Sequence, residues 1–139
     1  MVFSFSNLLK SKKTNKNSEP LPKIEFKGGT KYAENLNNDV YLDFEELGGF
    51  PFIKTIIVGD ISTKIKRTGC TLTFKFENDI IVLNSDNTTI ESEKIKNTQI
   101  FFTEIDFELD DNETKKIKND NVEEISYTFK NKIYSFKPI

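Results

Sequence analysis

Three carboxylates occupy every second position along one segment of the sequence. This spacing could place them together in a catalytic or metal-binding site. Asp106, Glu108 and Asp110 occupy every second position, so a strand would place them on one face about 7 Å apart. Carboxylate oxygens in such an array suit a hard divalent cation. No glycine-bearing calcium loop follows, so a solvated face that leads into a helix cap is the favoured interpretation. We predict no catalytic, cofactor-binding or metal-binding residue in this chain.

Histidine is absent from all 139 residues. Its absence excludes Ser-His-Asp triads, Cys-His pairs and histidine-based zinc sites. The single cysteine, Cys70, has no partner for an intramolecular disulfide and shares strand parity with Leu72 and Phe74. A free cysteine in that position is typical of a packed core. The chain is therefore predicted not to be an enzyme, and a carboxylate-dependent activity at Asp106, Glu108 or Asp110 is the weakest hypothesis.

The charge balance and the aromatic residues argue against nucleic-acid binding. The net charge is -2 at pH 7, whereas surfaces that neutralise many phosphates are strongly basic. The 13 Phe and 4 Tyr fall at the strand positions that Ile, Leu and Val also occupy, which indicates core packing rather than a base-stacking platform. The pairs at residues 28–29 and 48–49 are glycines without the spacing of a nucleotide-binding loop, and we predict turns there.

The N-terminal sequence is the strongest candidate for a functional contact. Residues 1–22 are predicted to form a flexible basic tail, because residues 10–22 combine several lysines and prolines without periodicity. An apolar cluster ahead of these lysines suits a peripheral anchor on an acidic membrane or a short helix that docks in a partner's groove. A loosely packed chain start is the alternative. The candidate contact residues are Phe3, Phe5, Leu8, Leu9, Lys10, Lys12 and Lys13.

The cellular location follows from the same segment. No run approaches the roughly 18 apolar residues that span a bilayer, and the apolar residues precede the lysines, the reverse of a secretory signal. We therefore expect a cytoplasmic protein that contacts a membrane only peripherally, if at all.

Residues 23–139 are predicted to form a single β-rich domain. Period-2 alternation recurs along this stretch, most clearly where Leu72, Phe74 and Phe76 alternate with polar residues. The fold class we predict is mainly β, an antiparallel meander that forms a sandwich or a strongly curled sheet. One short helix is expected near residues 110–118, capped by Asp110 with Glu113 three positions later.

Several local features complete the predicted fold. Gly59 and Asp60 are expected to form a tight hairpin between strands at residues 53–58 and 61–67. Residues 40–44 are predicted to form a half-buried strand with Tyr41 on its exposed face. Residues 100–109 are predicted to form a central strand, and residues 130–132 to close a C-terminal hairpin.

The functional hypothesis rests on a well-formed core without a catalytic constellation. It is a non-enzymatic protein-interaction module, of the kind used as an adaptor, an inhibitor or an immunity-type protein. The alternative is a carrier for a small apolar ligand, with a cavity enclosed by the curled sheet. An unidentified protein partner is expected, and the open edges of such a sheet also allow a homodimer.

Overall fold

The computed structural model describes residues 23–139, so every prediction made for residues 1–22 lies outside the described residues. The described residues form a mainly β structure with one short helix, which confirms the predicted fold class. In chain order the elements are β1 (Lys31–Glu34), β2 (Asp39–Leu47), β3 (Phe50–Gly59), β4 (Lys64–Ile65), β5 (Thr71–Lys75), β6 (Ile80–Asn84), β7 (Ile90–Glu91), β8 (Glu93–Lys94), β9 (Phe101–Glu108), α2 (Asp111–Asn119), β10 (Glu124–Phe129) and β11 (Lys132–Pro138).

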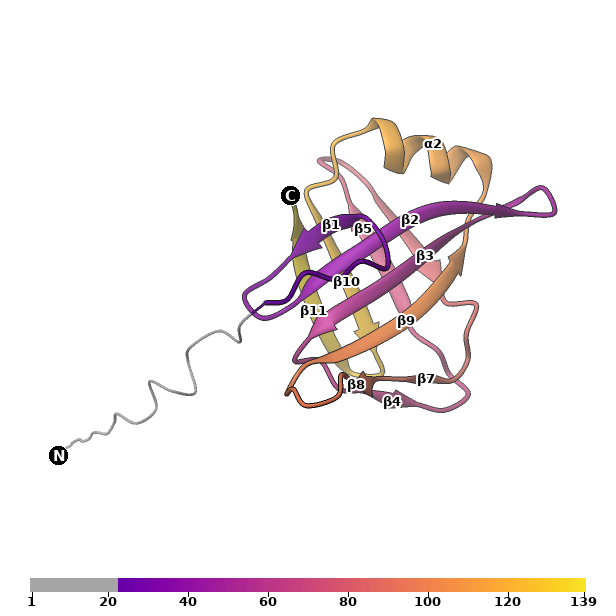
Figure 1. The fold of residues 1–139 in the computed structure, drawn as a ribbon. Helices are drawn as coiled ribbons and strands as arrows, with labels where there is room; N and C mark the ends of the chain where they lie inside the picture. The colour runs from indigo at the N-terminus through magenta and orange to yellow at the C-terminus, as the bar shows by residue number, and fades with distance from the viewer. Residues whose placement is uncertain (1–22) are drawn as a thin grey trace, which may run out of the picture.

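Nine strands form one antiparallel sheet in the order β6-β5-β10-β11-β1-β2-β3-β9-β8, and β4 pairs with β7 in a small second sheet. The large sheet curls on itself, so that β2, β3 and β9 cross in front of β5, β10 and β11 (Figure 1), while α2 lies over one end. The curl stops short of closure. Between β6 and β9 the described residues form a single bridge, from Ser85 to Phe107.

One apolar cluster fills the inside of the curl. Tyr127 lies in it, with its ring centroid 6.1 Å from that of Phe107, 6.0 Å from Phe129 and 5.8 Å from Phe136. Tyr127, Phe74, Phe107 and Phe136 are all fully buried. Buried aromatic rings contribute both apolar area and favourable ring contacts. The space that an enclosed ligand would need is thus occupied by side chains.

A second, smaller cluster covers part of the outer face of β2, β3 and β9. Residues 23–28 run across this face, and the Phe26 ring lies 5.3 Å from the Tyr41 ring. Tyr41 is 6% exposed, so the prediction that its face of β2 is exposed was wrong. Tyr41 is buried by a tertiary contact with residues 23–28. The alternation of residues within β2 does not reveal that another segment covers this face. The buried members are Tyr41, Ile56, Val58 and Ile100, with Ile24, Phe26, Ile95 and Phe102 packed against them.

Two of the hairpins follow the expected turn chemistry. Gly48 and Gly49 have φ angles of 60° and 84°, and Leu47 pairs with Phe50 around them. Two central residues with positive φ form the turn that suits the twist of a two-residue hairpin. The C-terminal hairpin turns at Lys130 and Asn131, between β10 and β11, as predicted.

The tight hairpin predicted at Gly59 and Asp60 is not present. β3 pairs with β2 and β9, and β4 pairs with β7 instead. The chain leaves β3 through contacts of Asn38, whose side chain donates to Asp60 at 2.8 Å and accepts from the Ile61 amide at 3.2 Å. Asn37 also donates to Asp60, at 2.9 Å. The alternation of apolar and polar residues correctly predicted that Ile61 lies in the core. That sequence pattern does not reveal the side-chain contacts that direct the chain away from β3.

The helix α2 forms as predicted. Asp110 is its N-cap and accepts from the Glu113 amide at 2.7 Å, while Glu113 accepts from the Asp110 amide at 2.9 Å. Ile117 is buried, and the Lys116 ammonium lies 4.5 Å from the centroid of the Phe76 ring. The helix therefore packs over the open end of the curl. Within residues 23–139 no helix is long and apolar enough to cross a membrane.

The predicted central position of residues 100–109 is only partly right. β9 pairs with β3 along its length, but its other edge meets just the two residues of β8 and the bridge at Ser85. It is the second strand from the end of the sheet. Its apolar start resembles a central strand because the second cluster covers Phe102 from outside.

Candidate interaction surfaces

Within residues 23–139, β6 is the end strand of the large sheet, and part of its outer edge has no strand partner. The alternation of hydrogen bonds shows which groups are free. Phe76 donates to Asp79 at 2.8 Å and Ser85 donates to Cys70 at 2.9 Å, so Ile81 and Leu83 bond to β5 by the antiparallel pattern. The backbone groups of Ile80 and Val82 therefore point away from β5, towards the open edge.

The side chains of β6 do nothing to protect this edge. Its five residues are Ile, Ile, Val, Leu and Asn, with no charge and no proline. Ile80 is 57% exposed and Val82 48% exposed. Exposed edges normally carry charged residues, proline or a bulge, because an unprotected edge pairs with other chains. The edge at Ile80 and Val82 is therefore suited to strand addition.

The outer face next to this edge is uncharged at its centre. Val82 pairs with Thr73, Thr73 with Ser126, and Ser126 with Ser135. This row crosses β6, β5, β10 and β11. An exposed aliphatic residue, Ile133, lies on the same face and is 67% exposed. A partner strand beside β6 would thus extend a polar, hydroxyl-rich face.

A second candidate surface is a hollow on the outer face of β3 and β9. It is a hollow of about 400 Å³ between these strands and the segment that carries β7 and β8. Four of its lining side chains are carboxylates, and the only basic one is Lys54. We call it the acidic groove. Its lining residues are Lys54, Asn87, Thr89, Ile90, Glu91, Glu93, Phe102, Glu104 and Asp106.

Within the acidic groove, Asp106 is held in an unfavourable environment for a carboxylate. Partial burial raises the pKa of Asp106, and Asp86 and Glu104 raise it further, while Lys54 acts in the opposite direction. A raised pKa means that the folded chain disfavours the ionised form. The single lysine of the groove, Lys54, therefore does not balance its four carboxylates.

This environment gives a testable stability effect. Asp106→Asn is expected to raise the melting temperature at pH 7, because the amide removes an ionised group that the fold disfavours. The gain should be full above the raised folded pKa and should vanish below the unfolded pKa of about 4. Thermal unfolding of both proteins between pH 3 and pH 8 measures it. A loss of stability at pH 7 would show that the attraction to Lys54 outweighs the repulsion.

The hairpin of β2 and β3 projects beyond the rest of the sheet (Figure 1) and ends in exposed apolar residues. Leu47 and Phe50 are each 75% exposed and pair directly across the turn. Phe52 lies on the same face, between Glu45 and Glu108 on the neighbouring strands. We call Leu47, Phe50 and Phe52 the apolar tip. Exposed apolar groups that cluster in this way mark contact sites.

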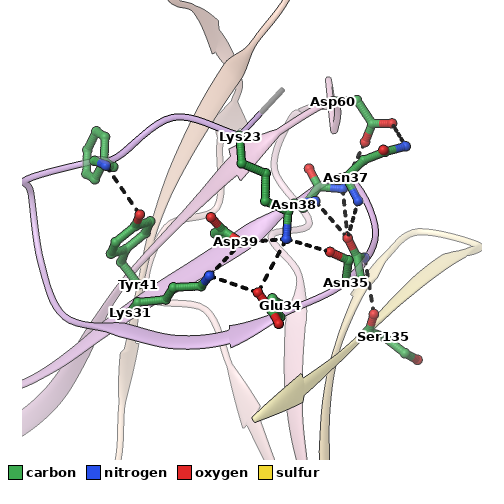
Figure 2. A network of polar contacts seen from close by, with 11 residues as sticks. Lys23, Lys31, Glu34, Asn35, Asn37, Asn38, Asp39, Tyr41, Asp60 and Ser135 are labelled. Carbon is green, nitrogen blue, oxygen red and sulfur yellow. Dashed lines mark hydrogen bonds and ion pairs between the residues drawn. The ribbon is translucent and has the colours of Figure 1, made fainter. Parts of the chain in front are cut away.

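A polar network fixes the start of the described chain to the sheet. Figure 2 shows Lys23 and Lys31 converging on Asp39, with ammonium–carboxylate distances of 2.9 Å and 3.4 Å. The Asp39 side chain is 7% exposed. Lys31 also binds Glu34 at 2.8 Å, which lowers the pKa of Glu34 and raises that of Lys31. Lys23 donates to the Asn35 carbonyl at 2.9 Å. The network therefore fixes the position of Lys23, the first of the described residues, on the sheet.

The structure separates the three carboxylates that the sequence placed together. Asp106 and Glu108 lie on the outer face of β9, but Asp110 caps α2 and is engaged there. Residues 23–139 contain no group of three or more Cys, Asp or Glu residues placed to hold a metal ion. Cys70 is buried, as predicted, and burial raises its pKa to about 12. The candidate contact residues Phe3, Phe5, Leu8, Leu9, Lys10, Lys12 and Lys13 all lie outside the described residues.

The surfaces that the sequence reasoning missed are the edge of β6 and the apolar tip. Both left a signal in the sequence. Residues 80–83 form an apolar run with no charge on either face, and Leu47 and Phe50 flank a glycine pair directly. Large apolar residues that cluster beside a polar or glycine turn and stay exposed indicate a contact.

Comparison of the chain with protein-family models, curated proteins and solved structures found no match.

Proposed function

We propose that this chain is a non-enzymatic protein-interaction module that binds an extended segment of another protein by strand addition along β6. The observation that carries the proposal is the edge at Ile80 and Val82, where free backbone groups coincide with exposed apolar side chains. In strand addition the main-chain hydrogen bonds supply affinity, and alternate side chains supply specificity.

The position of the bridge to β9 limits the length of the added strand. At Asp86 the edge is already used, since its amide donates to the Asp106 carbonyl at 2.7 Å. A partner strand would therefore lie beside β6 only on the side of Ser85 that leads back to Ile80. Its end could extend beyond Asp79, past the turn that joins β5 to β6. Its alternate side chains lie beside Ile80 and Val82 on the outer face, which favours apolar residues at those positions.

Charge favours a different protein over a second copy. The acidic residues Glu77 and Asp79 precede β6, and Asp86 follows it. In a symmetric antiparallel pair centred on Val82, Asp79 of one copy would lie opposite Ser85 of the other, which is already bridged to Phe107. Asp79 would also lie diagonally beside Asp86 of that copy, which is repulsive. A partner segment with an apolar centre and a basic residue beside Asp79 meets no such repulsion. We therefore assign the edge to a segment of that chemistry.

Site-specific photo-crosslinking in the native cell tests this proposal. A benzophenone amino acid replaces Ile80 in one variant and Ile133 in a second. The two positions are comparably exposed, at 57% and 67%, but only Ile80 lies beside the open edge. We expect one protein to be crosslinked from position 80 and not from position 133.

Other outcomes contradict the proposal in different ways. Identical adducts from both positions, or none from either, would mean that the edge of β6 binds no partner. An adduct with the mass of two copies of this chain would show that the edge of β6 pairs with a second copy instead of a different protein. The apolar-ligand carrier receives no support from the described residues, because the inside of the curl is filled by the core cluster.

A further inference from the structure

The outer face of β2, β3 and β9 presents two kinds of surface in a fixed order. Close to the end of β3 at Gly59, the acidic groove contains Glu93, Glu104 and Asp106. Further along the same strands, the apolar tip begins at Phe52 and ends at Phe50. Moving from Gly59 to Phe50 along β3, one therefore crosses carboxylates first and exposed apolar side chains last.

The sequence that precedes Lys23 has the complementary order. Reading back from Lys23, the lysines at positions 16, 13, 12 and 10 come first. The apolar residues Leu9, Leu8, Phe5 and Phe3 come after them. Basic residues would thus meet the carboxylates of the groove, and apolar residues would meet the apolar tip.

The position of Lys23 makes the match reachable. Lys23 is fixed to Asp39, and together with Ile24 it lines a small hollow that also includes Gly59 and Ile100. From there the groove begins two residues along β9, at Phe102. The nine steps from Gly59 to Phe50 span about 30 Å of strand. The thirteen residues from Lys10 to Lys23 extend to about 43 Å, so the basic residues reach the groove and the residues before them reach the tip.

We propose that residues 1–22 of the same chain dock on this face, with the lysines in the acidic groove and the apolar residues on the apolar tip. The groove has one basic lining residue against four carboxylates, and the docked lysines would supply the missing positive charge. The apolar residues would cover Leu47 and Phe50, which are otherwise exposed. The docking residues of this face differ from Ile80 and Val82 at the open edge of β6, so the proposal stands or falls independently of the proposed function.

Paramagnetic relaxation in the full chain tests the docking. A nitroxide is attached through Ser4→Cys, since Cys70 is buried, and amide signals are recorded on the isotope-labelled protein. We expect the signals of Leu47, Phe50 and Phe52 to be lost. The signal of Ile133 should keep its intensity, because Ile133 lies on β11, which β1 and β2 separate from β3 in the sheet.

Two charge variants separate docking from chance proximity. Glu104→Lys combined with Asp106→Lys should restore the lost signals. Glu77→Lys combined with Glu123→Lys makes the same change in net charge away from the groove and should leave the loss unchanged. If both pairs restored the signals equally, the groove would not be the binding site and the proposal would fail.

A mixed sample identifies which copy supplies the segment. Nitroxide-bearing chain without isotope is mixed with labelled chain without nitroxide. Docking within one chain predicts no signal loss in this mixture. Signal loss at the apolar tip in the mixture would assign the segment to a second copy and overturn the proposal. In the chain that carries both nitroxide and isotope, an even loss over the whole surface, or no loss at all, would also overturn it.

Discussion

Val82→Pro is expected to weaken binding of the partner captured at the edge of β6 by about 10- to 100-fold, which corresponds to the cost of a missing buried hydrogen bond. Proline removes the Val82 amide proton and fills the space that an added strand would occupy. The amide is not used within the sheet, so the free energy of unfolding should change by less than about 1 kcal/mol. Binding of the purified partner and urea unfolding measure the two effects.

A neighbouring substitution supplies the matched control. The backbone groups of Ile81 point towards β5 and bond to it. Ile81→Pro should therefore lower the free energy of unfolding by more than Val82→Pro does. Thr73→Lys places a charge on the outer face directly opposite Val82 and leaves the edge intact. If Thr73→Lys abolished binding while Val82→Pro did not, the partner would bind the face and not the edge.

Asp39→Asn is expected to lower the free energy of unfolding by about 2 kcal/mol. Removing one partner of a fully buried ion pair costs about 3 to 5 kcal/mol. The loss is smaller here, because the side chains of Lys23 and Lys31 are 32% and 34% exposed and remain partly hydrated. The substitution preserves the shape of Asp39, so the loss reports charge. Urea unfolding of the full chain measures it.

Glu34→Gln is the control for this effect. Glu34 binds the same two lysines, but its side chain is 44% exposed, so the change should be small. Because residues 23–28 are fixed by the network, Asp39→Asn should also speed tryptic cleavage after Lys27. Equal effects of the two substitutions, with unchanged cleavage, would show that the network does not hold this segment.

The local elements of the fold could be predicted because their causes are local. The capping box at Asp110 and Glu113, and the alternation of Leu72 and Phe74, each depend on residues a few positions apart. The order of the strands depends on contacts between distant residues. Asn38 directs the chain out of β3 by binding Asp60, and no period in the sequence reveals that pairing.

The same distinction explains what was missed in the candidate sites. An edge strand and an inner strand can share one sequence pattern, because the difference lies in which strand comes to lie beside them. The apolar run at residues 80–83 indicates a strand, but its place at the end of the sheet follows from β5 pairing with β10. Likewise, the carboxylates of the acidic groove come from segments that the sequence separates, since Glu91 and Asp106 meet only through the fold.

Amide hydrogen exchange of the complex with the crosslinked partner tests the central claim most directly. In the free chain, the amides of Ile80 and Val82 should exchange rapidly, while those of Ile81 and Leu83 are already protected by β5. Strand addition predicts that binding protects Ile80 and Val82 and leaves Ile81 and Leu83 nearly unchanged. A complex in which Ile80 and Val82 continue to exchange as fast as in the free chain would contradict the account.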